Sequence, residues 1–448
     1  MLRRLHPPFP TRRLAIAAAA LAPVWLLSGS RAGLVAAIVA TVVLALVVAV
    51  EAWLIPARWA VEVERELPAS VGITDRADGV YRLRSRWPRA LRFALYDQLP
   101  RGIAHADTGG ATAPARGVLE AREELPLPVA ITGRERGVWP LGPLALRVEG
   151  PLRLLQRTLR AEPGDRITVT PSLAGVRSFR LLTVQHRMRD MGVRAMRRRG
   201  EGTSFSSLRE YVPGDDPRRI DWKASARRGE LISREFTVEQ GQTVMIAVDA
   251  GRMMTQLAGA LPRFEYALSS ALVLADVAAS SDDRVGLIVF DDEVRAFVPP
   301  AAGLAALSRI RDALVPLTAR LVEPDYALAF RTLAARQRRR SLIVLFTDVI
   351  DARASQALIA HTARSAARHL PVVVALRNEQ LLAAATPRPG MSTEALYESA
   401  AAEELLLARD DALARMRHAG VSVLDVPVEA MTAAVVNRYL ELKARAAV

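Results

Sequence analysis

Residues 243–249 read TVMIAVD, a run of apolar and β-branched residues that ends in an aspartate. Such a continuous apolar run is typical of a parallel strand that is buried on both faces. Four similar runs follow along the chain: RVGLIVF at 284–290, SLIVLFTD at 341–348, PVVVAL at 371–376 and VSVLDV at 421–426. Together these runs predict an α/β fold built on a parallel sheet.

Helical segments are expected between and after these strands, at 263–280, 303–315, 326–337, 353–369, 393–418 and 431–446. The alternation predicts a doubly wound, Rossmann-like sheet with helices on both faces. In such a sheet the functional crevice lies outside the carboxyl ends of the strands, where Asp249 and Asp348 stand. Aspartates at strand ends also cap the helices that follow. A functional role and a capping role therefore both remain open for this pair.

The region 57–176 lacks a helical period and carries short β-like runs separated by turn residues. Examples are VEVEREL at 61–67, RFALYD at 92–97 and LALRVEG at 144–150. Many short strands at this spacing predict a small β-sandwich.

Residues 14–55 are predicted to form a transmembrane helical hairpin. The segment 33–55 is apolar except for Glu51, and a helix needs about 20 apolar residues to cross a bilayer. The upstream segment 14–27 is shorter and contains Pro23. It is therefore either a short span that extends to about Ser30 or a signal-like region.

Arginines predict how this hairpin is oriented. Four arginines precede the first apolar segment, and only Arg31 lies in the connection. The positive-inside rule then places the N-terminus in the cytoplasm and returns the chain there after two spans. The expected location is the bacterial inner membrane, with the soluble domains facing the cytoplasm. A single span with a cytoplasmic N-terminus would instead place these domains outside, as an extracytoplasmic adhesion-type module requires.

Composition limits the chemistry. The chain has no cysteine, which excludes disulfides, thiolate catalysis and Cys-based zinc sites. Its net charge of +14 comes almost wholly from arginine, with clusters at 177–199 and 336–340. A solvated surface or attraction to an anionic leaflet explains these clusters. Nucleic-acid binding is unlikely on sequence grounds, because the clusters lack interleaved aromatic residues and match no recognised module.

Motifs for common enzymes are also missing from the sequence. Lys223 and Lys443 follow Trp222 and Leu442 rather than glycine, so no phosphate-binding P-loop is present. The histidines have no metal-ligand spacing, and there is no GxSxG nucleophile elbow. We therefore expect no enzymatic activity.

Residues 208–235 read LREYVPGDDPRRIDWKASARRGELISRE, a stretch of alternating charges around a tight turn and a tryptophan. The pattern predicts ion pairs at a domain junction, or else a ligand or partner site. Its candidate residues are Arg209, Gly214, Asp215, Asp216, Arg218, Asp221, Trp222, Ser225, Arg227, Arg234 and Glu235. The stretch resembles the signature of the bacterial domain of unknown function 58 family, which precedes a von Willebrand factor A type domain. The resemblance divides the soluble part into a basic linker with the signature (177–240) and a von Willebrand factor A-like domain (241–448).

The resemblance implies a metal-ion-dependent adhesion site made of Asp-x-Ser-x-Ser, a loop Thr and a later Asp. Here Asp249 is followed by Gly251 and Met253 at the serine positions, and the loop 323–326 offers no hydroxyl at the expected place. Asp348 matches the later aspartate. A divalent cation prefers several oxygen ligands, so the site is degenerate. The sequence therefore predicts no certain cofactor, and at most a weakly bound Mg²⁺ at Asp249 and Asp348.

Family members are similar to proteins encoded beside MoxR-type AAA+ ATPases, which implies an adaptor role. We therefore expect a membrane-anchored adaptor or scaffold that holds such an ATPase, or an unidentified client, through the surface around Asp249, Asp348 and Asp325. The alternative is an envelope-biogenesis enzyme with a carboxylate site at Asp249 and Asp348. Asp291 and Asp292 are expected to be solvated turn residues.

Overall fold

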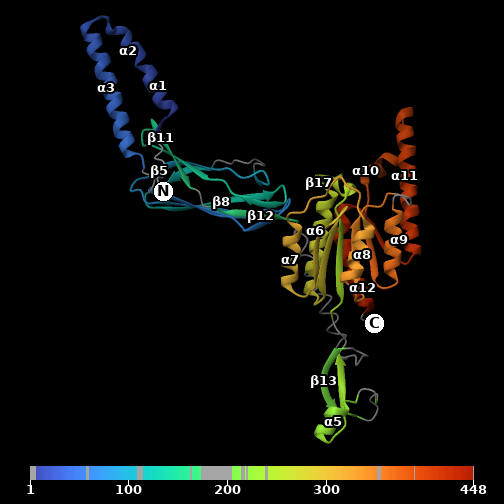
Figure 1. Ribbon diagram of the computed structural model, residues 1–448. Helices are drawn as coiled ribbons and strands as arrows, with labels where there is room; N and C mark the ends of the chain where they lie inside the picture. Colours follow the sequence, from blue (N-terminus) through green and yellow to red (C-terminus); the bar gives the residue numbers. More distant parts are fainter. Residues whose placement is uncertain are drawn as a thin grey trace. The chain divides into compact units, whose positions relative to one another are not determined.

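The computed structural model of the chain describes residues 7–56, 60–107, 115–161, 164–172, 204–212, 217, 220–237, 241–350, 355–387 and 389–446. The chain divides into two compact units, Met1–Ser172 and Leu173–Val448. Figure 1 shows apolar helices and a β-rich region in the first unit, and an α/β body in the second.

The N-terminal helices form a hairpin of α1 (Arg12–Ala20), α2 (Ala22–Leu26) and a 3-10 turn η1 (Leu27–Gly29), followed by α3 (Arg31–Leu54). Pro23 lies in the first turn of α2. Because proline lacks an N–H group, it cannot continue the hydrogen bonding of α1. Ser30 caps α3 by accepting a hydrogen bond from the backbone N–H of Gly33 at 3.0 Å.

Two of these segments are long and apolar enough to cross a membrane. They are Arg12–Gly29, with a mean hydropathy of 1.2, and Arg31–Leu54, with a mean hydropathy of 3.0. Their apolar side chains are largely uncovered by protein, and Trp53 is 82% exposed. By length and composition alone, these helices indicate a membrane association.

The end of α3 is attached to the β-rich region through Glu51. Its carboxylate is buried and accepts the backbone N–H of Leu154 at 3.1 Å. Arg157 also donates to the carbonyl of Pro56 at 3.0 Å. The charge that interrupts the apolar segment is thus a structural contact between the helix and a β-turn.

The β-rich region contains three sheets. The first has the order β1 (Phe9–Pro10), β11 (Leu155–Ala161), β10 (Leu144–Glu149), β5 (Leu91–Asp97), β7 (Ala115–Leu119). The second has the order β2 (Val61–Glu66), β4 (Arg76–Ser85), β8 (Glu124–Gly133), β6 (Ile103–His105). The third has the order β3 (Ser70–Gly72), β12 (Arg166–Thr170), β9 (Gly137–Pro140). Leu83, Leu95, Leu119 and Leu146 join the first two sheets in one buried core.

A buried ion pair lies beside this core. Arg65 donates to Asp97 at 2.9 Å, and the hydroxyl of Tyr81 donates to the other carboxylate oxygen at 2.7 Å. Burial and the neighbouring Asp97 charge raise the pKa of Tyr81, so the hydroxyl remains a donor. The three side chains form one polar cluster inside an apolar sandwich.

The α/β body contains a six-stranded sheet in the order β19 (Val294–Ala301), β18 (Arg284–Phe290), β15 (Thr243–Asp249), β20 (Leu342–Thr347), β21 (Leu370–Leu376), β22 (Ser422–Val426). Five strands are parallel, and β19 is an antiparallel edge. One face packs on α6 (Arg263–Ser280), α7 (Leu304–Leu314) and α12 (Val428–Ala446). The other face packs on α8 (Tyr326–Arg336), α9 (Gln356–Ala366) and α11 (Thr393–His418).

The mixed α/β prediction is confirmed, and each predicted strand and helix of this body has a counterpart whose ends differ by at most three residues. The unpredicted elements of this body include one longer strand and one helix, besides the short η4 (Arg252–Thr255), β16 (Leu257–Ala258) and β17 (Leu261–Pro262). Strand β19 contains Pro299 and Pro300 and is half-exposed, so it lacks the continuous apolar run of a buried strand. Helix α10 (Glu379–Ala385) is short and has no buried residue.

The signature region forms a separate small motif in which β13 (Ser204–Glu210) pairs antiparallel with β14 (Ile232–Thr237). Helix α5 (Trp222–Arg228) lies between them in sequence and ends at Gly229, whose positive φ of 77° suits glycine.

Replacing Asp97 with alanine should lower the free energy of unfolding of the sandwich by about 3–5 kcal/mol, because Arg65 loses its buried partner. Asp78→Ala is the matched control, since its side chain is 87% exposed in a weak pair with Arg76, and it should change stability by less than about 0.5 kcal/mol. Urea-dependent proteolysis of the reconstituted chain measures the free energy of unfolding of both variants. Equal effects of the two variants would contradict the assigned role of the buried pair.

Candidate functional site

Two acidic residues meet at the carboxyl edge of the sheet, as the sequence predicts. Asp249 is the last residue of β15, and Asp348 follows Thr347 at the end of β20. The two strands are adjacent and parallel, with Val248 paired to Phe346. Both aspartates are buried, so each carboxylate depends on protein donors rather than on bulk water.

Asp249 receives three hydrogen bonds. One carboxylate oxygen accepts from the backbone N–H of Gly251 at 2.7 Å. The other accepts from the hydroxyls of Thr347 at 2.7 Å and Tyr326 at 3.0 Å. Burial raises the pKa of Asp249 to about 6, although these donors oppose the rise. Among the described residues, Asp249 therefore has neutral donors and no cationic partner.

Tyr326 corrects the expectation that its loop offers no hydroxyl. Its hydroxyl lies 2.9 Å from that of Thr347 as well as near Asp249. Burial and the neighbouring charge of Asp249 raise its pKa well above the usual value, so the group stays a neutral donor. The ring packs edge-on against Phe290 with the centroids 5.7 Å apart.

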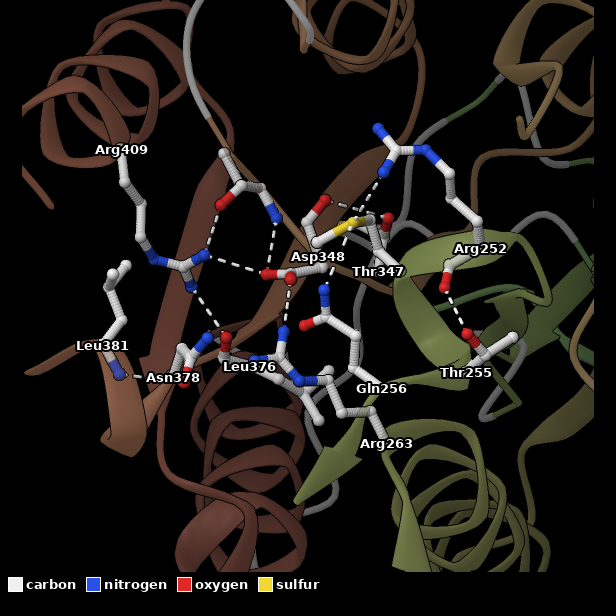
Figure 2. Close-up of polar contacts among 12 residues, drawn as sticks. Arg252, Thr255, Gln256, Arg263, Thr347, Asp348, Leu376, Asn378, Leu381 and Arg409 are labelled. Carbon is white, nitrogen blue, oxygen red and sulfur yellow. Dashed lines mark hydrogen bonds and ion pairs between the residues drawn. The ribbon is translucent and has the colours of Figure 1, made fainter. Parts of the chain in front are cut away.

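Asp348 is held by two arginines from different helices (Figure 2). Arg263, the first residue of α6, pairs with one carboxylate oxygen. Arg409, on α11, donates to the other oxygen at 2.8 Å, and the backbone N–H of Val349 donates to the same oxygen at 2.9 Å. Both guanidinium groups are buried, which strengthens their attraction to the carboxylate.

Arg409 joins three strand ends. Besides Asp348, its guanidinium donates to the carbonyl of Val349, to the carbonyl of Leu376 at 2.9 Å and to Asp425 at 3.1 Å. These partners follow or end β20, β21 and β22. The side chain therefore fixes the carboxyl ends of three neighbouring strands relative to α11.

The donors at these two aspartates do not fit a divalent cation. Mg²⁺ requires a near-octahedral set of oxygen ligands, whereas both oxygens of Asp348 already receive hydrogen bonds from arginine. Gly251 and Met253 supply no hydroxyl, and the hydroxyls of Thr347 and Tyr326 donate to Asp249. A guanidinium charge thus occupies the place where a cation would neutralise Asp348.

A small pocket opens beside this site. It is lined by Asp249, Arg252, Met253, Glu323, Pro324, Tyr326, Asp348, Ile350 and Ser355. Arg252 and Glu323 form an ion pair at its mouth, and the backbone N–H of Arg252 donates to the carbonyl of Val322 at 2.9 Å. The pocket therefore has buried, satisfied carboxylates at its base and a mixed apolar and charged rim.

The expectation for Asp291 is wrong. Asp291 is buried rather than solvated, while Asp292 is exposed. Arg320 donates to both oxygens of Asp291 at 2.8 Å, and Arg295 adds a contact at 2.8 Å. Burial opposes ionisation, but these hydrogen bonds outweigh it and lower the pKa of Asp291.

The carboxylates of Asp291, Asp292 and Glu293 lie within 4.8 Å of one another, a spacing that could hold a metal ion. Arg320 contacts all three, at 2.8, 2.9 and 3.0 Å respectively. Its backbone N–H also donates to the carbonyl of Ala250 at 2.8 Å. The cluster therefore anchors the 319–325 loop beside the end of β15.

Asp325 caps a helix. It is the N-cap of α8, and its carboxylate accepts the backbone N–H of Leu328 at 2.8 Å. The cap positions Tyr326 at the first helical residue, and the partner role of Asp325 stays a prediction.

The described signature residues have local structural roles. Asp221 caps α5 by accepting two backbone N–H groups, and the hydroxyl of Ser225 accepts the N–H of Ile232 at 2.8 Å. Arg209 donates to the carbonyl of Glu210, and Arg227 is exposed in the last turn of α5. Trp222 is exposed, so among the described residues it does not pack into a core.

Other signature predictions lie outside the described residues: Gly214, Asp215, Asp216 and Arg218. Arg234 and Glu235 belong to β14 and pair in register with Leu208 and Ser207, but their side chains are not among those described.

Sequence reasoning missed Arg263, Arg409 and Arg320. Arg409 carried a signal, because it shares the buried stripe of α11 with Ala402, Leu413 and Met416. An arginine on a buried helical stripe needs an acidic or carbonyl partner. Arg263 and Arg320 gave no comparable signal, since their partners are 85 and 29 residues away in sequence.

Comparison with known proteins identifies a family for part of the chain. Residues 207–421 match the family described as "Protein of unknown function DUF58", which confirms the resemblance over this segment. An uncharacterized protein of Mycobacterium tuberculosis is 24% identical over 155 residues, 34% of this chain and 48% of that protein. Uncharacterized protein YeaD of Bacillus subtilis is 26% identical over 178 residues, 39% of this chain and 44% of YeaD. The matched segment spans about half the length of these relatives.

A solved structure, the complex of zinc 2-glycoprotein with prolactin-inducible protein from human seminal plasma, aligns with 24% of this chain and 92% of that chain. The identity is 10% and the TM-score 0.17. This likeness supports no statement about fold or function.

Replacing Arg409 with methionine should lower the free energy of unfolding of the α/β body by about 3–5 kcal/mol, because Asp348 and two carbonyls lose a buried donor. Arg415→Met, on the same helix, removes only an exposed pair with Asp411 and should cost less than about 0.5 kcal/mol. Thermal unfolding of the solubilised chain gives the melting temperatures of the two variants for comparison. Similar melting temperatures for both variants would contradict the network's assigned role.

The raised pKa of Asp249 predicts a pH-dependent stability. Because the folded-state pKa is about 6 and the ordinary pKa of an aspartate is 3.8, the folded state binds a proton more tightly than the unfolded state. The charged carboxylate therefore destabilises the fold above pH 6, by an amount on the order of 3 kcal/mol, and this penalty disappears as the pH falls from about 6 to about 4. Asp249→Asn lacks the penalty. Wild type should gain stability relative to the variant over this range, and a constant difference would contradict the assignment.

Proposed function

We propose that this protein is a membrane-anchored adaptor whose carboxyl-edge surface binds another protein. In this proposal the helices Arg12–Gly29 and Arg31–Leu54 span the bacterial inner membrane, and the soluble parts face the cytoplasm. The bound protein is a MoxR-type AAA+ ATPase or a client of that ATPase. The α/β body, with its antiparallel edge strand, corresponds to a von Willebrand factor A type domain that contains a degenerate adhesion site.

The observation that carries the proposal is that the acidic residues at the strand ends are satisfied within the protein. Asp249 accepts three protein hydrogen bonds, and Asp348 is paired with two buried arginines. A general base or nucleophile needs an accessible lone pair. The arrangement therefore favours binding over the envelope-biogenesis enzyme, and it favours a metal-independent mode of binding.

The surface around the pocket has the composition of a protein interface. Two leucines on carboxyl-edge loops are strongly exposed, Leu257 at 62% and Leu321 at 82%. They flank the pocket-lining residues Met253 and Pro324 and the ion pair of Arg252 with Glu323. Apolar groups with a few charges at their edge are typical of the buried core and polar rim of protein–protein contacts.

The fixed geometry of the carboxyl edge supports the same role. Arg320 and Arg409 tie the loops of this edge to the sheet through Asp291, Asp348 and Asp425. A preorganised surface binds with a smaller loss of conformational entropy than a mobile one. Anchoring in a membrane then raises the effective concentration of the partner at that surface.

The test is capture of the AAA+ ATPase from solubilised native membranes by the full chain, with the captured protein identified by mass spectrometry. Leu257→Ser with Leu321→Ser should reduce capture at least about tenfold, because the exposed apolar contacts are lost. Leu304→Ser is the control, since Leu304 is also exposed but begins α7 at the other edge of the sheet. Adding a metal chelator should not change the amount of ATPase captured.

Capture that is equal for wild type and the double variant would move the partner surface away from the carboxyl edge. Absence of any AAA+ ATPase among the captured proteins would contradict the adaptor proposal. Loss of capture in chelator would contradict metal independence. Protease digestion of the α/β body in spheroplasts, with protection in inverted vesicles, would instead favour the extracytoplasmic adhesion-type module.

A further inference from the structure

The amino edge of the sheet carries an arginine surface that the proposed function does not use. The segments that enter β20, β21 and β22, here called entering loops, contain Arg338–Arg340, Arg368 and Arg417, of which Arg417 lies in the last turn of α11. These three strands are neighbours in the sheet, so their entering loops are neighbours too. We call these five arginines the amino-end rim.

The rim arginines lie at the surface of the body. All five are exposed. Within the described part of the chain, Arg338, Arg340, Arg368 and Arg417 make no ion pair with a carboxylate. By contrast, Arg415 on α11 is paired with Asp411.

Acidic residues are absent from the three entering loops. Residues 337–341 read QRRRS, 367–370 read ARHL and 417–421 read RHAGV. Five positive charges on adjacent loops without an acidic neighbour in those loops create a local positive potential. The five positive charges repel one another in the isolated domain, and an anionic partner would reduce this repulsion.

We propose that the amino-end rim binds the anionic phospholipid surface of the membrane in which the chain is anchored. Three features favour this occupant. The same chain carries two helices that are long and apolar enough to cross a bilayer, which brings the rim to a high local concentration of lipid headgroups. Arginine binds phosphate through a planar fork of donors. Leu370, beside Arg368, is exposed and can enter the apolar side of the headgroup region.

Nucleic acid fits the rim less well. Single-strand binding uses aromatic residues that stack on bases, and the three entering loops contain no Phe, Tyr or Trp. The rim also lies at the opposite ends of the strands from Asp249 and Asp348. Lipid contact at the rim would therefore leave the carboxyl edge open to its protein partner. The inference depends on the proposed function in one respect: the cytoplasmic location decides which leaflet the rim contacts.

The absence of cysteine in the chain permits a site-specific test. Ala367→Cys places one label in the rim, and Ala260→Cys places a matched label on a carboxyl-edge loop, both at exposed positions. Each full-length variant is spin-labelled and reconstituted in nanodiscs of phosphatidylcholine, with or without phosphatidylglycerol. Collisions of the label with lipid-soluble oxygen, relative to a water-soluble nickel chelate, report contact with lipid.

The label at position 367 should contact lipid in anionic discs at low salt, and the label at 260 should not. Arg338→Gln, Arg339→Gln and Arg340→Gln together should reduce the lipid-contacting population at least about tenfold, because each arginine near an anionic surface contributes about fivefold. The matching triple lysine variant keeps the charge and should keep the contact. High salt should remove it.

Several results would overturn the inference. Equal contact in neutral and anionic discs would show that tethering alone brings the rim to the bilayer. No contact in anionic discs would show that the rim does not bind lipid. Protection of the 367 label by duplex DNA, without lipid contact, would assign the rim to nucleic acid. None of these outcomes depends on capture of an AAA+ ATPase.

Discussion

The pairing of Asp348 with Arg263 and Arg409 is the interaction on which the carboxyl edge of the α/β body depends. One carboxylate joins helices from both faces of the sheet, because α6 lies on one face and α11 on the other. Arg409 extends the connection to Leu376 and Asp425. Removing a single partner would leave buried charge without compensation, which is far more costly than the pair itself is stabilising.

This network changes what the two strand-end aspartates can do. In a site that binds a cation, carboxylates and hydroxyls turn their lone pairs toward one empty point. Here the hydroxyls of Thr347 and Tyr326 donate to Asp249, and guanidinium groups neutralise Asp348. Among the described residues, both carboxylates at the base of this edge are therefore hydrogen-bonded within the protein, which supports the proposed recognition of another protein.

Much of the fold could be predicted because its determinants are local. Residues 243–249 and 341–348 form continuous apolar runs, and such runs are needed in strands covered on both faces. The position of Asp249 and Asp348 at one edge followed from this pattern. Strand β19 could not be found in the same way, since Pro299 and Pro300 interrupt it and its edge position leaves it half-exposed.

The chemistry of the site could be predicted only in part, because it depends on contacts between distant segments. The lack of hydroxyl side chains at Gly251 and Met253 was visible in the sequence. The arginines that hold Asp348 were not, since Arg263 lies 85 residues from Asp348. Asp291 was misread for the same reason: its partner Arg320 is 29 residues away, and a pair of acidic residues after a strand otherwise indicates a turn.

The most direct test of this account is a calorimetric titration of the solubilised chain with Mg²⁺, repeated with Asp249→Asn. The account predicts no saturable heat of binding for either protein at millimolar Mg²⁺, because the oxygens of both aspartates are already occupied by protein donors. Saturable binding by wild type that is lost in Asp249→Asn would contradict it, and would show that the arginines and hydroxyls yield to a cation.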